Sequence, residues 1–242
     1  MATEAEEFLV HYGVKGMKWG VRNDERGGYR LQTAGPIVDS NIHASTKAAG
    51  QKVAALMASR YGFQISSIQT IGPDHPEYQY GTVGFVKATP GKRGGDIFVR
   101  DHNLRKELKD AEDLGWFAKD CGHEHGLLTH ESAHALFHAE QQVKNGFLGP
   151  KVTGGNIKAR DRALDASSKV AERAGISPFQ FLSKVSGYAE ASGTREEMEA
   201  ELFSQYHWSP NPPPFVKVWG ETLHREMGID STPFREEVRD RA

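Results

Sequence analysis

Apolar residues recur at helical spacing along most of the chain. In the segment 44–61, Leu56 and Met57 follow Val53 by three and four positions. This spacing places the three side chains on one helix face. Gly62 follows directly, and glycine commonly ends a helix. We therefore expect an N-terminal helix over about 44–61.

Three runs of β-type residues follow this predicted helix. They are separated by stretches that contain Gly and Pro, which favour turns. The runs cover residues 63–71, 78–88 and 96–100. Together they predict a small β-sheet.

The chain after Asp101 is helical in pattern almost to its end. The candidate helices cover residues 103–118, 126–145, 158–174, 177–185, 194–207 and about 215–227. The second should end at Asn145–Gly146, because Gly often follows the last helical residue. Since these helices follow the sheet instead of alternating with its strands, the order predicts an α+β fold with a small mixed sheet and segregated helices.

Composition is that of an ordinary globular protein and excludes several classes. The 30 Lys and Arg nearly balance the 32 Asp and Glu, whereas a general nucleic-acid or membrane-surface binder would show a basic excess. The single Cys121 excludes an intrachain disulfide framework and a zinc ribbon built from several cysteines. No run approaches 18 apolar residues, so no membrane span is predicted. We expect neither nucleic acid nor membrane as a partner.

The first 36 residues differ from the rest of the chain. They combine an acidic start with a polar, Gly-rich stretch and show no helical or strand periodicity. We expect a flexible appendage and linker over 1–36 and one folded domain over 37–242. The acidic start lacks the basic and apolar regions of a secretory signal peptide, so Sec-dependent secretion is not expected.

The clearest chemical motif is His-Glu-Ser-Ala-His, which begins at His130 within the predicted helix 126–145. His130 and His134 are four positions apart, so both imidazoles project from one helix face and can bind one metal ion. Glu131 lies on an adjacent face, where a carboxylate can accept a proton from metal-bound water. The alternative is a surface or half-buried helix whose histidines have ordinary hydrogen-bond partners. The apolar neighbours of the motif favour a site, because buried polar groups without partners are costly.

A catalytic zinc site usually has three protein ligands, so a third must come from elsewhere. The extended metzincin motif continues with a glycine and a third histidine, but this chain has Phe137 and Glu140 at those positions, which excludes that variant. His138 lies too far along a straight helix to reach the same ion. Less favoured candidates for the third ligand, outside this helix face, are His123, His125, Asp161 and Asp165.

The segment 185–206 offers better candidates. Glu197 and Glu201 are four positions apart and share one face of the predicted helix 194–207. One carboxylate can bind the metal while the other accepts a hydrogen bond from the far ring nitrogen of a ligating histidine. Thr194 and Glu197 also fit a capping box, in which Glu197 would only cap its own helix. In that case Glu201 could be the ligand.

These motifs together resemble those of the gluzincin metallopeptidases. HExxH is followed by a separate helix with E-x-x-A-E-x-F, and a Tyr precedes that helix. The closest likeness is to the branch that contains the anthrax lethal factor catalytic domain and the polyvalent-type metallopeptidase domains of phages and mobile elements. The resemblance covers roughly residues 95–210 and implies a zincin-like fold. It also implies Zn²⁺ as the cofactor, with His130, His134 and Glu197 as its ligands.

The resemblance also implies roles for the neighbouring residues. Glu131 would be the general base, and Tyr188 would donate a hydrogen bond to the developing oxyanion. With Glu197 as the ligand, the spacing of the two carboxylates leaves Glu201 to accept the hydrogen bond from a ligating histidine. One departure is Glu199, where the family usually has an aromatic residue. A carboxylate there predicts a more exposed face of the helix.

A second element lies in the appendage, at HYGVKGMKWGVR, residues 11–22. Its basic and aromatic side chains stand among three glycines, and such a peptide is not expected to hold a structure alone. A disordered tail with incidental aromatics is one interpretation. The element is also similar to one in tailed-phage virion proteins, which implies docking to phage head or capsid proteins. The candidate docking residues are His11, Tyr12, Lys15, Met17, Lys18, Trp19 and Arg22.

The expected function is therefore that of a phage head-associated zinc metallopeptidase. It would hydrolyse peptide bonds of a protein or peptide substrate by metal-activated water, in the virion or the host cytoplasm. One alternative is a minor capsid or decoration protein that retains a zincin scaffold without turnover. Another is a cell-wall peptidase used in entry or lysis. The intact Glu131 favours an enzyme, because a site kept only for structure would not need a base.

Overall fold

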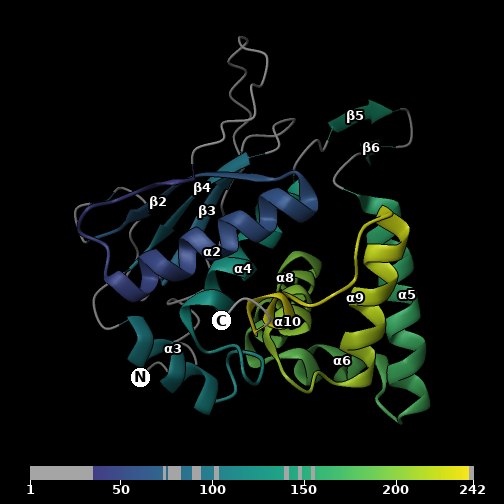
Figure 1. Ribbon diagram of the computed structural model, residues 1–242. Coiled ribbons are helices and arrows are strands. Elements are labelled where there is room, and N and C mark those ends of the chain that lie inside the picture. The colour runs from purple at the N-terminus through teal and green to yellow at the C-terminus, as the bar shows by residue number, and fades with distance from the viewer. Residues whose placement is uncertain are drawn as a thin grey trace, which may run out of the picture.

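The structure is a computed structural model (Figure 1), and it places most of the chain beyond the appendage. The described residues are 35–72, 75, 83–88, 94–100, 104–138, 142–146, 149–153 and 156–239. The predicted docking residues between His11 and Arg22 lie outside them, as does nearly all of the predicted appendage 1–36. The described part has an α+β fold, as the order of patterns predicts.

A four-stranded mixed sheet forms one side of the fold, with the order β1-β2-β4-β3. Strands β1 and β4 run parallel to β2, whereas β3 runs antiparallel to β4. The sequence does not predict β1, because two residues are too few to show a period. The strands are β1 (Ile37–Val38), β2 (Gln64–Thr70), β3 (Gly84–Ala88) and β4 (Gly94–Val99).

Helices α2 (Ala44–Tyr61) and α4 (Glu124–His138) pack against the sheet and against each other. The bounds of α2 are those predicted. Gly62 follows it in the left-handed conformation at φ 59°, and its N–H donates to the carbonyl of Ala58. Such a cap favours glycine because other residues are strained at positive φ.

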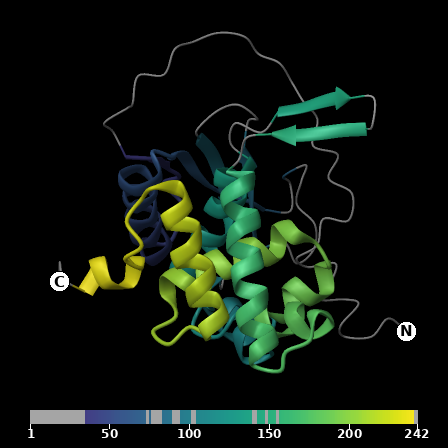
Figure 2. The same ribbon diagram turned by 90° about the vertical axis from the view of Figure 1, so that its right-hand side faces the viewer.

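On the other side, α4 packs against α8 (Arg195–Trp208), which in turn contacts α9 (Pro214–Met227). Helix α9 lies along α5 (Ile157–Arg173), as Figure 2 shows. The core is continuous from the sheet through α4 and α8 to α9. The remaining helices are α3 (Leu104–Asp113), α6 (Pro178–Val185), α7 (Gly187–Ser192) and α10 (Phe234–Arg239).

Two predicted helices end earlier than their patterns indicate. Helix α4 ends at His138 instead of Asn145, and a hairpin follows it, formed by β5 (Gln142–Gly146) and β6 (Gly149–Thr153). Residues 138–142 carry no large apolar side chain, so one more helical turn would bury little apolar surface. Figures 1 and 2 show the hairpin projecting from the sheet and helices.

Helix α3 covers only part of the predicted range 103–118. It ends at Asp113, and Gly115 adopts a positive φ of 79°. The chain turns there toward α4. The described part of the chain holds no helix with the length and apolar character that a membrane span requires.

Candidate metal centre

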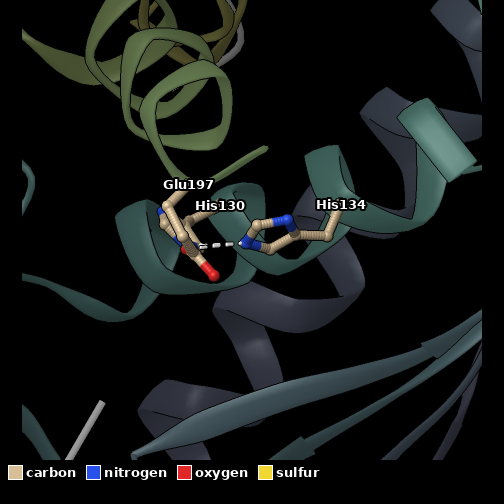
Figure 3. A group of neighbouring side chains, drawn as sticks. All are labelled: His130, His134 and Glu197. Atoms are coloured by element: carbon tan, nitrogen blue, oxygen red, sulfur yellow. Dashed lines mark hydrogen bonds and ion pairs between the residues drawn. The ribbon is translucent and has the colours of Figure 1, made fainter. Parts of the chain in front are cut away.

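Helices α4 and α8 bring His130, His134 and Glu197 together, and their side chains point toward one another (Figure 3). Glu197 Oε2 lies 3.2 Å from His130 Nε2 and 3.0 Å from His134 Nε2. The two Nε2 atoms are 3.0 Å apart. Within the described residues, this is the one group of three or more potential ligands that clusters so closely.

The three atoms fit a zinc ion. Zinc bonds to nitrogen and oxygen are about 2.0–2.1 Å long, so tetrahedral ligand atoms lie about 3.3 Å apart. The separations of 3.0–3.2 Å are close to that value. Two imidazoles and one carboxylate also form a ligand set of catalytic zinc sites, in which the fourth position stays open.

The close packing of α8 on α4 fixes the two ligand helices relative to each other. Ser204 Oγ donates to the carbonyl of Gly126 at 2.9 Å. One turn further along α8, Trp208 Nε1 donates to Thr129 Oγ1 at 2.7 Å. Both contacts are buried, and hydrogen bonds formed in a dry environment resist separation because each broken partner would be left without water.

The carboxylate of Glu201 lies at the ring nitrogen of His130 that faces away from the ligand cluster. Its Oε1 lies 3.0 Å from His130 Nδ1, and its Oε2 accepts a hydrogen bond from the backbone N–H of Ala118 at 3.2 Å. The side chain is fully buried. A carboxylate at the far nitrogen orients the imidazole and leaves Nε2 free to face the ligand cluster.

Glu197 does not complete a capping box. Thr194 Oγ1 accepts a hydrogen bond from the N–H of Glu197 at 3.3 Å, which is the first half of that motif. The carboxylate of Glu197 instead points to the two histidines. The backbone N–H of Thr194, which a capping box would pair with Glu197, donates to Ser192 Oγ.

The histidines and carboxylates of the cluster shift one another's pKa values. Burial by itself lowers the pKa of His130, but the adjacent Glu197 and Glu201 raise it well above its ordinary value. Burial by itself raises the pKa of Glu197, but His134 and His130 hold it far below its ordinary value. The cluster therefore requires positive charge, which protons or a metal cation can supply.

Glu131 lies beside the ligands and is buried at 7% exposure. Burial raises the pKa of its carboxyl, and the neighbouring His130 and His134 offset part of that shift. Strand β3 covers it: a Cβ added to Gly84 would lie 3.5 Å from Glu131 Oε1. A carboxyl with a raised pKa suits proton transfer near neutral pH.

Tyr188 lies in the first turn of α7, with its ring 6.0 Å from that of His130. Burial raises the pKa of its hydroxyl, and the negative charge of nearby Glu197 adds to this shift. The backbone N–H of Tyr188 donates to the carbonyl of Trp116 at 3.1 Å, which attaches α7 to the loop before α4. The hydroxyl therefore stays protonated and can donate a hydrogen bond.

The less favoured ligand candidates lie away from this cluster. The rings of His123 and His125 pack against Trp208, with centroid distances of 6.0 and 4.7 Å. The two aspartates form ion pairs, Asp161 with Arg195 and Asp165 with Lys169. The side chain of His138 lies outside the described residues.

The prediction that Glu199 marks an exposed helix face is wrong. Glu199 is 0% exposed and is paired with Arg160 of α5 and with Arg195 of its own helix. Sequence reasoning missed Arg160 entirely. Its signal is indirect, because a carboxylate in a buried helix requires a cation, but the sequence does not say which cation.

Comparisons with known proteins concern the N-terminus alone. Residues 2–26 match a family of unknown function, DUF7211. This stretch contains the predicted docking element 11–22 and lies outside the described residues, so it carries no information about the metal centre. The chain matches no curated protein and no solved structure.

Proposed function

We propose that this protein is a zinc-dependent metallopeptidase with a zincin-like fold. The observation that carries the proposal is the convergence of His130, His134 and Glu197 within 3.2 Å of one another. The buried Glu131 beside them supports turnover over a purely structural site. Zinc held by three protein ligands acts as a Lewis acid and lowers the pKa of a coordinated water toward about 7.

The chain's own residues then divide the remaining work. Glu131 accepts the proton of the attacking water and later delivers it to the leaving amine. The hydroxyl of Tyr188 donates a hydrogen bond to the oxyanion as it develops. Glu201 keeps the ring of His130 oriented through Nδ1.

We also propose where the enzyme acts. The element at residues 11–22 resembles one in tailed-phage virion proteins, and this resemblance supports docking to phage head or capsid proteins. The substrate would then be a protein or peptide met in the virion or in the host cytoplasm.

Metal analysis and one substitution test the enzymatic proposal. The purified full chain should hold about one zinc ion, and mass spectrometry should detect cleavage of a peptide library. Glu131→Gln should keep zinc and fold but lose on the order of a thousandfold or more of the cleavage rate, since the proton acceptor is removed and the ligands remain.

Glu196→Gln is the matched control, because Glu196 is exposed on the first turn of α8 next to the ligand Glu197. It should cleave at the wild-type rate. A Glu131→Gln protein as active as this control would refute the mechanism. Zinc binding without cleavage by the wild-type chain would favour a structural protein on a zincin scaffold.

A further inference from the structure

An ion network with a buried pair, Arg160 and Glu199, lies on the side of α8 that faces away from the ligand cluster. Glu199 is two positions from Glu197 and two from Glu201, and two helical positions turn a side chain by about 200°. Glu197 and Glu201 contact His130 on α4, whereas Glu199 contacts Arg160 on α5. The first turns of α8 are therefore held from two opposite sides.

The network consists of four charges of alternating sign. Glu199 Oε1 accepts from Arg195 Nε at 2.9 Å, and its Oε2 accepts from Arg160 Nε at 2.7 Å and from a second nitrogen of the same guanidinium. Arg195 also pairs with Asp161, with 2.7 Å between Nη1 and Oδ1. Arg160 and Asp161 are neighbours on α5, so two adjacent residues of one helix contact two residues on one face of another.

Arg160 also reaches α4, the other ligand helix. Its Nη1 donates to the carbonyl of Phe137 at 3.4 Å, and its guanidinium lies 4.7 Å from the centre of the Phe137 ring. Phe137 follows the ligand His134 by three positions. With only 2% of its surface exposed, Arg160 thus connects the two helices that supply the ligands.

We propose that Arg160, through Glu199, is a positioning residue of the metal centre. At the first turns of α8, beyond the contacts of Ser204 and Trp208, it holds the helix in the rotation at which the Glu197 carboxylate meets both Nε2 atoms. This inference rests on the proposed function for its relevance to zinc. Metal–ligand distances tolerate only about 0.2 Å, and the rigid, planar fork of an arginine fixes a carboxylate more narrowly than apolar contacts do.

The test separates positioning from stability by replacing both partners. Arg160→Met alone would leave Glu199 buried without its main cation, which is strongly destabilising. In the double variant Arg160→Met/Glu199→Met no charge is left without its partner, because Arg195 keeps Asp161. Replacing a buried ion pair by apolar residues of similar volume is often neutral for stability.

The control is Arg162→Met/Glu226→Met, a more exposed ion pair. This pair also starts on α5 but joins it to α9 instead of α8. In a competition titration, the Arg160/Glu199 double variant should bind zinc about 10-fold more weakly than wild type, the low end of the 10–100-fold loss seen when a ligand loses a directly bonded partner. Its Co²⁺ absorption spectrum should also change. The control should match wild type in both measurements.

A metal-free crystal structure of each variant supplies a readout that does not depend on zinc. Glu197 Oε2 should move away from His134 Nε2 in the Arg160/Glu199 double variant and stay near 3.0 Å, its present distance, in the control. If wild type binds no metal, the proposed function fails, and this displacement alone decides the inference. Wild-type zinc affinity with an unmoved Glu197 would overturn it.

Arg160→Lys covers the case in which the double variant does not fold. It keeps the positive charge but loses the fork, so the folded protein should also bind zinc more weakly and show a displaced Glu197. A lysine variant identical to wild type in both readouts would likewise refute the positioning role.

Discussion

Two pairs of histidines, all buried except the half-buried His134, lie at opposite ends of α8, and their surroundings differ in charge. His130 and His134, near its first turn, face the carboxylates of α8. His207 and His224, near its last turn, face a tyrosine hydroxyl. The distance between the two rings does not distinguish the pairs, since the imidazoles lie close together in both. The neighbouring groups determine whether a buried pair can hold a cation.

In the second pair, the Nε2 atoms of both rings face a hydroxyl instead of a carboxylate. The backbone N–H of Phe234 donates to His207 Nδ1 at 3.2 Å, so the neutral ring carries its proton on Nε2. That nitrogen donates to the oxygen of Tyr61 at 2.8 Å, and the same oxygen lies 2.6 Å from His224 Nε2. The Tyr61 hydroxyl occupies the place between the imidazoles that Glu197 occupies at the metal centre.

The pKa values of the two pairs shift in opposite directions. Burial lowers the pKa of His207 well below its ordinary value and that of His224 to about 3. Carboxylates on both sides raise the pKa of His130 despite its burial. In this fold, the histidine pair that acidic side chains face is therefore the one suited to hold a cation.

Matched substitutions in the two pairs test this difference most strongly. His134→Gln should weaken zinc binding by more than about 100-fold, a larger loss than that of an outer partner. His224→Gln should leave zinc binding unchanged, because the side chain it alters bonds Tyr61. Zinc-competition titration of both variants gives the answer. Equal losses would mean that the pairs do not differ as their neighbours indicate.

The two carboxylates of the metal centre should also differ from each other. Glu197→Ala removes a ligand and should lower zinc affinity more than Glu201→Ala, which removes only an orienting partner and should cost about 10–100-fold. The same titration ranks them. The reverse order would make Glu201 the ligand.

The second pair should make the protein sensitive to acid. Because the pKa of His224 lies at about 3 in the fold and near 6.5 when unfolded, the unfolded chain binds more protons between those values. The free energy of unfolding should therefore fall as pH drops below 6.5, by about 1.4 kcal/mol per pH unit for this group. Urea unfolding of the metal-free protein at pH 5.5 and pH 4.5, between the two pKa values, measures the slope.

His224→Gln serves as the comparison, since glutamine does not titrate. Its slope should be shallower by that amount, and equal slopes would exclude His224 as a source of acid sensitivity. The contribution of His130 to stability changes with pH in the opposite direction. In the metal-free protein its pKa is raised in the fold, so the stability that its ion pairs supply is present at low pH and lost as pH rises past that raised pKa.

Deletion of the N-terminal residues should have the smallest effect on the two histidine pairs. Strand β1 begins at Ile37, so deletion of residues 1–34 should leave thermal stability and zinc content nearly unchanged. The same deletion should abolish co-purification with phage particles. Trp19→Ala combined with Lys15→Glu and Lys18→Glu should mimic it, since aromatic and basic side chains commonly anchor such peptides.

Either of two results would contradict the docking role. A truncated protein that loses zinc would mean that the segment contributes to the folded domain. A truncated protein that still enters particles would place the targeting information elsewhere in the chain.

The sequence predicts local features of this protein better than its long-range contacts. The bounds of α2 follow from its own apolar spacing and Gly62, and HExxH places two imidazoles on one face whatever surrounds them. The pairing of Glu199 with Arg160 joins residues 39 positions apart, and no periodicity encodes it. The early end of α4 depends on what its next turns could bury, which is a property of the assembled core.

The sequence of helix α8 can tolerate few changes in side-chain size. Every residue from Met198 to Trp208 is buried, so a change in the size of any of these side chains requires a matching change in a neighbouring helix. Evolutionary divergence should therefore concentrate in peripheral parts such as the β5–β6 hairpin. Distant relatives of this protein should be easier to recognise by the sequence of volumes along this one helix than by overall identity.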